Sequence, residues 1–158
     1  MLRAAGVQVV VEGDWLNRMR PGSFDPIGCS GTTPRRPPAP ATPPGARHLH
    51  QRAVRPARPL CQALVDYNGV FHVISAGRCN HAGVSGGSGP IPSGDGNTLM
   101  IGWEIDYNGV NQEMTAAQYN ASLAATAAVL TRLGRDSSYA RGTGRRAPPA
   151  RSTRPSST

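Results

Sequence analysis

The sequence predicts a mixed α/β fold in which helices cover one β-sheet and two segments rich in arginine and proline are disordered. Short apolar or β-branched runs bounded by turn residues indicate several strands. One long amphipathic stretch, residues 115–133, is typical of a helix that covers a sheet. At 158 residues the chain has room for one domain.

The net charge of the chain is +8, and the charged residues are distributed unevenly along it. Residues 29–59 contain six arginines and residues 142–158 contain four, and neither segment contains an acid. The same two segments hold 11 of the 15 prolines. A segment with so little to bury and so much charge predicts disorder. We therefore divide the chain into an ordered domain built from residues 1–28 and 60–141, with disordered segments at 29–59 and 142–158.

Several classes of protein are disfavoured by composition. No run of 18 apolar residues is present, so we expect no membrane span. The first apolar run is followed directly by Glu12 and Asp14, which makes a poor signal peptide and leaves the localisation open. Cys29, Cys61 and Cys79 lack the CxxC spacing of a structural zinc site. The arginine segments lack the interleaved aromatic residues of a nucleic-acid interface, so we expect no nucleic-acid partner.

The first expected strand is the β-branched run at residues 7–12. The approach to Gly28 would lead into a second strand, but the chain turns there into the arginine and proline segment, so we expect none. Order resumes at Leu60, where two apolar runs flank Asn68-Gly69. That pair predicts a hairpin with a type I′ turn, because both of its residues tolerate positive φ.

The strongest helix signal begins at Thr115, which forms a capping box with Gln118, and Gly134 ends the helix. The spacing of its larger residues predicts one buried apolar stripe. That stripe consists of Tyr119, Leu123, Ala127, Leu130 and Leu133.

Candidate site residues gather between Arg78 and Gly109. Asn80 and His81 precede a loop rich in glycine and serine, and the apolar run that follows the loop delivers Glu104. An acid at the end of a core strand is costly to bury unpaired, so it faces a cleft or has a partner. The plainer alternative is a solvated strand end. The loop lacks the GK[ST] ending of a phosphate-binding loop.

The other histidines carry weaker signals. His72 alternates out of a hairpin strand and is expected to be a plain surface or half-buried histidine. His48 and His50 form an H-x-H pair, but they lie in the arginine and proline segment, so we do not expect them to hold a metal.

With these elements placed, residues 2–28 and 60–141 resemble the zinc-dependent N-acetylmuramoyl-L-alanine amidases of type 2, whose fold is shared with the peptidoglycan recognition proteins. The likeness is closest to actinobacterial and actinophage lysins. Four motifs carry it, and they are specific only in combination. They are Asp66-Tyr67-Asn68-Gly69, Asn80-His81-Ala82-Gly83, Ile101-Gly102-Trp103-Glu104, and the run from Met114 to Tyr119.

The resemblance implies a monomeric hydrolase that acts on peptidoglycan, with Glu104 as general base and Asn80 and His81 beside the substrate. It also implies Zn²⁺ held by three protein ligands, in motifs like HHTA, GHRE and KxDP. This sequence has CSGTT at residues 29–33 and GTGRR at 142–146, where the two histidine motifs belong. We therefore predict that the chain binds no zinc and is catalytically inactive.

The two departures from the family coincide with the two arginine-rich segments, and a frameshift explains both. With GC-rich codons, GCSGTTPRRPP can be read in a neighbouring frame as GVLWHHTAATS. The segment from Gly142 to Thr158 can be read as GHRETSTTGKIDPSFID once one G is restored. We therefore hypothesise a frameshifted amidase gene. Two alternatives stay open, a non-catalytic peptidoglycan-binding module and, less favoured, a basic nucleic-acid-binding protein.

Overall fold

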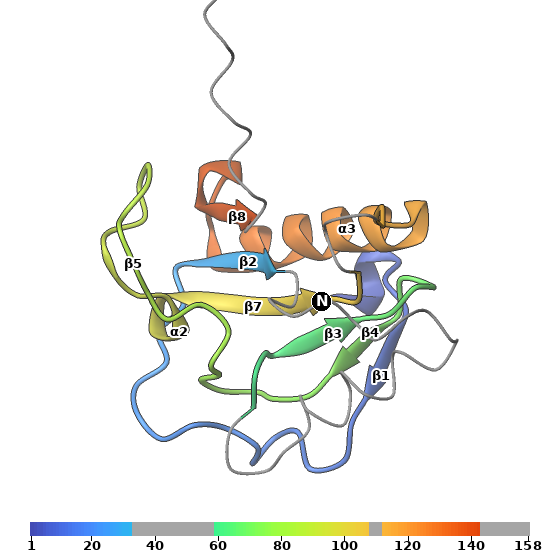
Figure 1. Cartoon of the computed structure of the whole chain (residues 1–158), viewed down its shortest axis with the longest axis horizontal. Helices are drawn as coiled ribbons and strands as arrows, with labels where there is room; N and C mark the ends of the chain where they lie inside the picture. Colours follow the sequence, from blue (N-terminus) through green and yellow to red (C-terminus); the bar gives the residue numbers. More distant parts are fainter. Residues whose placement is uncertain (33–58, 108–111, 143–158) are drawn as a thin grey trace, which may run out of the picture.

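A six-stranded mixed sheet forms the centre of the molecule (Figure 1). The computed structural model describes residues 1–32, 59–107 and 112–142. The strand order is β1-β4-β3-β7-β2-β8. In that order the strands are Val9–Val11, Phe71–Val73, Ala63–Val65, Met100–Ile105, Gly28–Thr32 and Ala140–Gly142. Strands β3, β7, β2 and β8 run parallel to one another, and β4 pairs antiparallel with β3.

The remaining elements are short, apart from one helix that lies along the sheet in Figure 1. They are η1 (Arg3–Ala5), β5 (Val84–Ser85), β6 (Gly94–Asp95), α2 (Gly96–Leu99), α3 (Ala116–Leu133) and η2 (Ser137–Tyr139). Within the described ranges, no helix has the length and apolar character needed to cross a membrane. The predicted α/β class, with a mixed sheet and a covering helix, is confirmed. Most of the two segments predicted to be disordered, residues 33–58 and 143–158, lies outside the described residues.

The prediction that no strand follows Gly28 is wrong. Strand β2 lies in the sheet interior and pairs in parallel with β7 on one side and β8 on the other. Its sequence, Gly-Cys-Ser-Gly-Thr, has little preference for strands, so the two neighbouring strands impose the conformation. A Cβ at Gly28 would lie 2.3 Å from the carbonyl oxygen of Tyr139, so the close approach there requires glycine. Residues 29–32, which were assigned to a disordered segment, therefore belong to the sheet.

The predicted hairpin is formed by β3 and β4, but its turn is not type I′. Among the loop residues only Gly69 has a positive φ, of 77°. The Asp66 amide donates to the Val70 carbonyl oxygen at 3.1 Å, which leaves a three-residue loop ending in a left-handed glycine. The Asp66 side chain accepts hydrogen bonds from the amides of Asn68 and Val70, both at 2.9 Å. This local capping favours the longer loop.

Both predicted ends of helix α3 are confirmed. The Thr115 side chain accepts a hydrogen bond from the Gln118 amide at 3.1 Å, and the Gln118 side chain accepts one from the Thr115 amide at 3.0 Å. This is the expected capping box. At the other end Gly134 adopts the left-handed conformation with φ of 65°.

The apolar stripe predicted for α3 is wrong at Tyr119, Leu123 and Ala127, which are exposed, whereas Leu130 is buried and Leu133 is half-buried. Tyr119 and Leu123 are 55% and 51% exposed. The buried side of the helix instead carries Gln118, Ala125, Val129 and Leu130. Gln118 is fully buried, and its Nε2 donates to the Asp106 carbonyl oxygen at 3.1 Å, which fixes the rotation of the helix.

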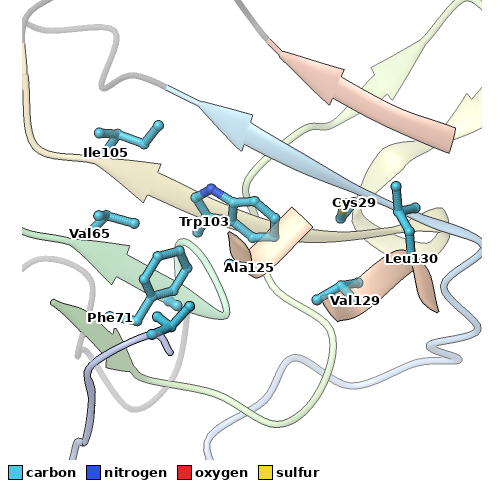
Figure 2. Close-up of a cluster of buried hydrophobic side chains, with 10 residues drawn as sticks. Cys29, Val65, Phe71, Trp103, Ile105, Ala125, Val129 and Leu130 are labelled. Carbon is cyan, nitrogen blue, oxygen red and sulfur yellow. The ribbon is translucent and has the colours of Figure 1, made fainter. Parts of the chain in front are cut away.

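The main hydrophobic core lies between α3 and one face of the sheet (Figure 2). Phe71 and Trp103 meet edge to face, with ring centroids 5.7 Å apart. From the helix, Val129 and Leu130 complete the cluster. This packing places every second side chain of β7 in the core and leaves the alternate side chains on the opposite face.

All three cysteines are free and buried. Cys29 belongs to the main core, whereas Cys61 packs with Leu64 and Ile74 in a second, smaller cluster. Burial raises the pKa of the Cys29 thiol to about 11, and it raises the pKa of the Cys79 thiol to about 11 as well. Thiols with such values are protonated at neutral pH and unreactive in the folded protein.

Candidate active site

Glu104 lies on the face of the sheet that α3 does not cover. Its strand, β7, is flanked by β2 and β3, and the register sets Glu104 beside Thr32 on one side and Leu64 on the other. Because Trp103 and Ile105 belong to the main core, alternation directs Glu104 to the opposite face. The side chain is half-buried there. The expectation that this acid stands near the end of a core strand is met, since only Ile105 follows it in β7.

The surroundings of Glu104 are polar on one side and apolar on the other. Thr32 contributes a hydroxyl, which donates to the Trp103 carbonyl oxygen at 3.4 Å, while Leu64 is almost fully buried. The Cys61 thiol also lies close. Burial raises the pKa of Cys61 well above its usual value, and the negative charge of Glu104 raises it further. Cys61 is therefore a neutral thiol and no candidate nucleophile.

His81 packs against β7 on the same face as Glu104. Its Nε2 lies 3.0 Å from the Met100 carbonyl oxygen, and its Nδ1 lies 3.3 Å from Ser30 Oγ. A carbonyl oxygen only accepts, so Nε2 carries the proton and Nδ1 accepts from the Ser30 hydroxyl. Burial lowers the pKa of His81, which keeps the ring neutral. Gly102 makes room for the ring, because a Cβ there would lie 2.2 Å from Nδ1.

Asn80 is held by its neighbours in a similar way. Its Oδ1 accepts a hydrogen bond from the Arg20 guanidinium at 2.8 Å, and its amide donates to the Pro59 carbonyl oxygen at 2.9 Å. Asn80 and His81 thus enter the glycine-rich loop from fixed positions. The side chain of Asn80 faces Arg20, so any substrate contact would be shared with that guanidinium.

The glycine-rich loop that follows is anchored at both ends. Asn97 Oδ1 accepts hydrogen bonds from the amides of Ala82 and Gly83, at 2.9 and 3.2 Å. Arg78 forms an ion pair with Asp95 near the end of the loop. Between these anchors most of the loop is exposed, and β5 and β6 form a small hairpin there. The two ends of the loop are therefore fixed by hydrogen bonds and an ion pair.

His72 is half-buried, as predicted. Its Nδ1 lies 2.8 Å from Glu12 Oε1 and its Nε2 lies 3.3 Å from Asp66 Oδ2. The ring therefore joins β1 to the hairpin turn. His48 and His50 lie outside the described residues.

The structure thus brings Glu104 and His81 to one face of the sheet, with Asn80 at its margin. Two further polar side chains on that face, Ser30 and Thr32, were missed because their strand was not predicted. The signal that could have found them is the period-two alternation from Cys29, which enters the core, to Ser30 and Thr32, which do not.

The sequence comparison decides the family. The family model described as N-acetylmuramoyl-L-alanine amidase matches residues 33–155, which is most of the chain. The chain belongs to the N-acetylmuramoyl-L-alanine amidase family. A search of curated protein sequences found no match.

Solved amidase structures share the fold of this family member. AmpD of Citrobacter freundii is 21% identical, with a TM-score of 0.54 over 95% of this chain and 83% of that chain. The amidase LysC of Clostridium intestinale URNW is 13% identical, with a TM-score of 0.51 over 85% of this chain and 81% of that chain. The endolysin amidase LysCS of the same organism is 13% identical, with a TM-score of 0.50 over 85% and 80% of the two chains. At these identities the likeness establishes the fold.

The amidase family is generally zinc-dependent, and the described residues do not fit a zinc site. Within residues 1–32, 59–107 and 112–142, no group of three His, Cys, Asp or Glu side chains could hold a metal ion. On the Glu104 face, both ring nitrogens of His81 already lie within hydrogen-bond distance of protein groups. No catalytic step through a metal can be built from these side chains.

Proposed function

We propose that this chain is the product of a frameshifted gene for a zinc-dependent amidase that cleaves the bond between N-acetylmuramic acid and L-alanine in peptidoglycan. In this proposal Glu104 is the general base, and Asn80 and His81 lie on the substrate side. The chain as written has lost its metal ligands and is inactive. Membership of the amidase family supports this reaction. For this chain we propose which residues of the amidase active site are still present.

The main support for this proposal is that three parallel strands end at the edge of the sheet that holds Glu104. Strands β7, β2 and β8 end at one edge of the sheet, where Glu104 stands beside Thr32 and Gly31 stands beside Gly142. In sheets with parallel strands, ligands bind outside the carboxyl ends of the strands. The edge that holds Glu104 is therefore where a catalytic centre is expected.

The neighbouring reading frame places histidines at this same edge. In the reading GVLWHHTAATS, the first histidine takes the position of Thr32, directly across from Glu104. In the reading that begins GHRE, the histidine takes position 143, one residue beyond the end of β8. The agreement between these histidines and the strand ends supports a lost metal site beside Glu104.

The remaining roles follow from the contacts of each side chain. Glu104 is half-buried beside an apolar Leu64, an environment suited to a carboxylate that accepts a proton. His81 uses both ring nitrogens on the protein itself, so we assign it the placement of the loop that borders the substrate. Asn80, which accepts a hydrogen bond from Arg20, is assigned a contact with the substrate.

The finer features of the proposal concern origin and partners. We infer an actinobacterial or phage source from the lysin-like motifs and the arginine bias of the sequence. Peptidoglycan is the partner, the chain acts as a monomer, and nucleic acid has no role. Residues 33–58 and 143–158 are then out-of-frame products rather than working parts of the domain.

Resequencing the gene around Gly28 and Gly142 tests the frameshift, and a frame-restored gene tests its consequence. Three proteins are purified and compared. They are the chain with the present sequence (the printed chain), the product of the frame-restored gene (the restored chain), and the restored chain with Glu104→Gln. The restored chain is expected to hold one zinc per molecule and to release stem peptides from cell walls. Its Glu104→Gln variant is expected to keep the zinc and lose release, because the base acts after metal binding.

The printed chain is expected to show neither stoichiometric zinc nor peptide release. One tightly held zinc per printed chain would overturn the proposed loss of the site. A restored Glu104→Gln variant with full activity would overturn the role of Glu104 while leaving the frameshift standing.

A non-catalytic peptidoglycan-binding module is the second candidate. It is favoured by the anchored loop and the polar face, both of which form from described residues without any metal. A cell-wall pull-down tests it. Retention of the printed chain on walls, without release of stem peptides, is the expected mark, and failure to bind walls would exclude it.

A further inference from the structure

Gln62, which directly precedes strand β3, is a buried polar residue with no part in the proposed reaction. It is only 6% exposed, so its carboxamide needs a hydrogen-bond donor for the oxygen and an acceptor for the nitrogen. The Gly102 amide donates to Oε1 at 2.7 Å, and Nε2 donates to the Gly77 carbonyl oxygen at 2.9 Å. The side chain of Gln62 therefore joins strand β7 to the turn that leads into Asn80 and His81.

Both backbone polar groups of Gly102 bind Gln62. In addition to the contact with Oε1, the Gly102 carbonyl oxygen accepts a hydrogen bond from the Gln62 amide at 2.8 Å. Strand β3 begins only at Ala63, so the side chain of Gln62 extends the pairing along β7 beyond the start of that strand. The His81 ring lies against Gly102, where a Cβ would lie 2.2 Å from Nδ1. Gln62 therefore fixes the part of β7 on which that ring packs.

The turn after β4 is also attached to Gln62. The Gln62 carbonyl oxygen accepts hydrogen bonds from the amides of Ile74 and Ser75, at 2.8 and 3.3 Å. The Gly77 carbonyl oxygen accepts from Ser75 Oγ and Cys79 Sγ, both at 3.4 Å, and from Gln62 Nε2 at the shorter distance of 2.9 Å. Gln62 thus contacts the turn at two points, through its backbone and through its side chain.

Asn80 is attached to the same short segment of the chain. Its amide donates to the Pro59 carbonyl oxygen at 2.9 Å, three residues before Gln62. Residues 59–62 therefore contact the Asn80 backbone directly and, through Gln62, the strand that carries Glu104.

We propose that Gln62 is a positioning residue of the candidate active site, which holds Asn80 and His81 in place relative to Glu104. The inference rests on the proposed function, because that function assigns these three residues to the reaction. A carboxamide suits the position because it carries an acceptor and a donor without a net charge. A carboxylate there would lack the donor, and a thioether would lack the donor and offer only a weak acceptor.

NMR of the printed chain tests the contacts of Gln62 without any substitution. The side-chain NH₂ protons of Gln62 are expected to exchange with water roughly tenfold more slowly than those of Gln8, because Gln62 is buried and Gln8 is exposed. Exchange at Gln62 as fast as at Gln8 would overturn the proposal, and this result does not depend on the stability of any variant.

Gln62→Met keeps the length of the side chain and removes its strong hydrogen bonds. Burial lowers the pKa of His81, and loss of the Gln62 contacts is expected to let water reach the ring. The pKa of His81, followed by NMR of its ring nitrogens, should then rise toward its usual 6.5. His81→Gln identifies the signals, because it removes them. An unchanged pKa of His81 in Gln62→Met would overturn the proposal.

Val129→Ala is the matched control, because Val129 is 3% exposed and lies in the core on the α3 side of the sheet. It is expected to lower the stability of the chain without changing the pKa of His81. An equal rise in both variants would overturn the proposal, since the effect would then follow stability rather than the Gln62 contacts. Neither measurement uses zinc, peptidoglycan or the restored chain, so its failure is distinct from a failure of the proposed function.

Discussion

One face of strand β7 packs in the hydrophobic core, and the other face is polar. On the α3 side, Trp103 and Ile105 enter a closed apolar core. On the other side, Gly102 and Glu104 share a polar surface with His81, which is tied together by hydrogen bonds. The side chains that stabilise the core and the side chains of the candidate site therefore lie on separate faces of one strand. The loss of metal ligands that we propose would therefore leave the residues of the core face in place.

Strand β2 shows the same division between its two faces. Cys29 fills a place in the core, while Ser30 and Thr32 extend the polar face. A strand with little β-preference keeps its place because β7 and β8 supply hydrogen bonds on both sides. The sheet thus includes a strand whose own residues have little preference for β structure.

The largest expected effect comes from the core face. Trp103→Ala removes the edge-to-face contact with Phe71 and opens a cavity, so we expect unfolding to become easier by about 3–5 kcal/mol. Urea unfolding followed by circular dichroism measures it. Glu104→Gln is the matched change on the other face and is expected to cost far less. Similar losses in both variants would break the division between the faces.

The close packing of His81 predicts the next effect. Gly102→Ala places a methyl group where the ring lies, so we expect a loss of about 1–3 kcal/mol in the free energy of unfolding. In a double-mutant cycle, adding His81→Ala should relieve most of that loss. Additive losses would mean that the two residues do not compete for one space.

The cap of α3 predicts a smaller change. Thr115→Ala removes the acceptor for the Gln118 amide and should lower the free energy of unfolding by about 1 kcal/mol. Thr131→Ala, at an exposed position within the same helix, is the control and should be nearly neutral. A neutral Thr115→Ala would show that Gln118 and its buried contacts hold the helix start alone.

The smallest effect is a dependence on pH. Burial lowers the pKa of His81 below its usual 6.5, so on acidification the unfolded chain takes up this proton first. The contribution of His81 is therefore present above pH 6.5 and is lost as the pH falls through the lowered value. Urea midpoints of the parent should drop more between pH 7 and pH 5 than those of His81→Gln. Parallel curves would contradict a buried neutral imidazole.

The ends of helix α3 depend on residues close together in the sequence, and they were predicted correctly. Thr115, Gln118 and Gly134 fix the ends of α3 within a few residues, and the structure confirms them. Strand β2 could not be predicted, because its partners β7 and β8 are distant in sequence. The rotation of α3 was missed for the same reason, since it depends on the hydrogen bond from Gln118 to Asp106.

The site was predictable only in part. Glu104 could be placed from the apolar run before it, and the structure puts it on the face of that strand away from α3. Its neighbour Thr32 came from the unpredicted strand. Roles in binding or catalysis depend on a substrate and a metal, so Glu104, Asn80 and His81 remain predictions.

The reaction of the three buried cysteines with a thiol reagent can measure how often the folded chain opens. Cys29 lies on the helix side of the sheet, whereas Cys61 lies in the second cluster. A thiol reagent can label them only when the surrounding structure separates, so the labelling rate counts rare opening events. Because the thiols lie in different clusters, separate labelling rates would distinguish release of α3 from unfolding of the whole sheet.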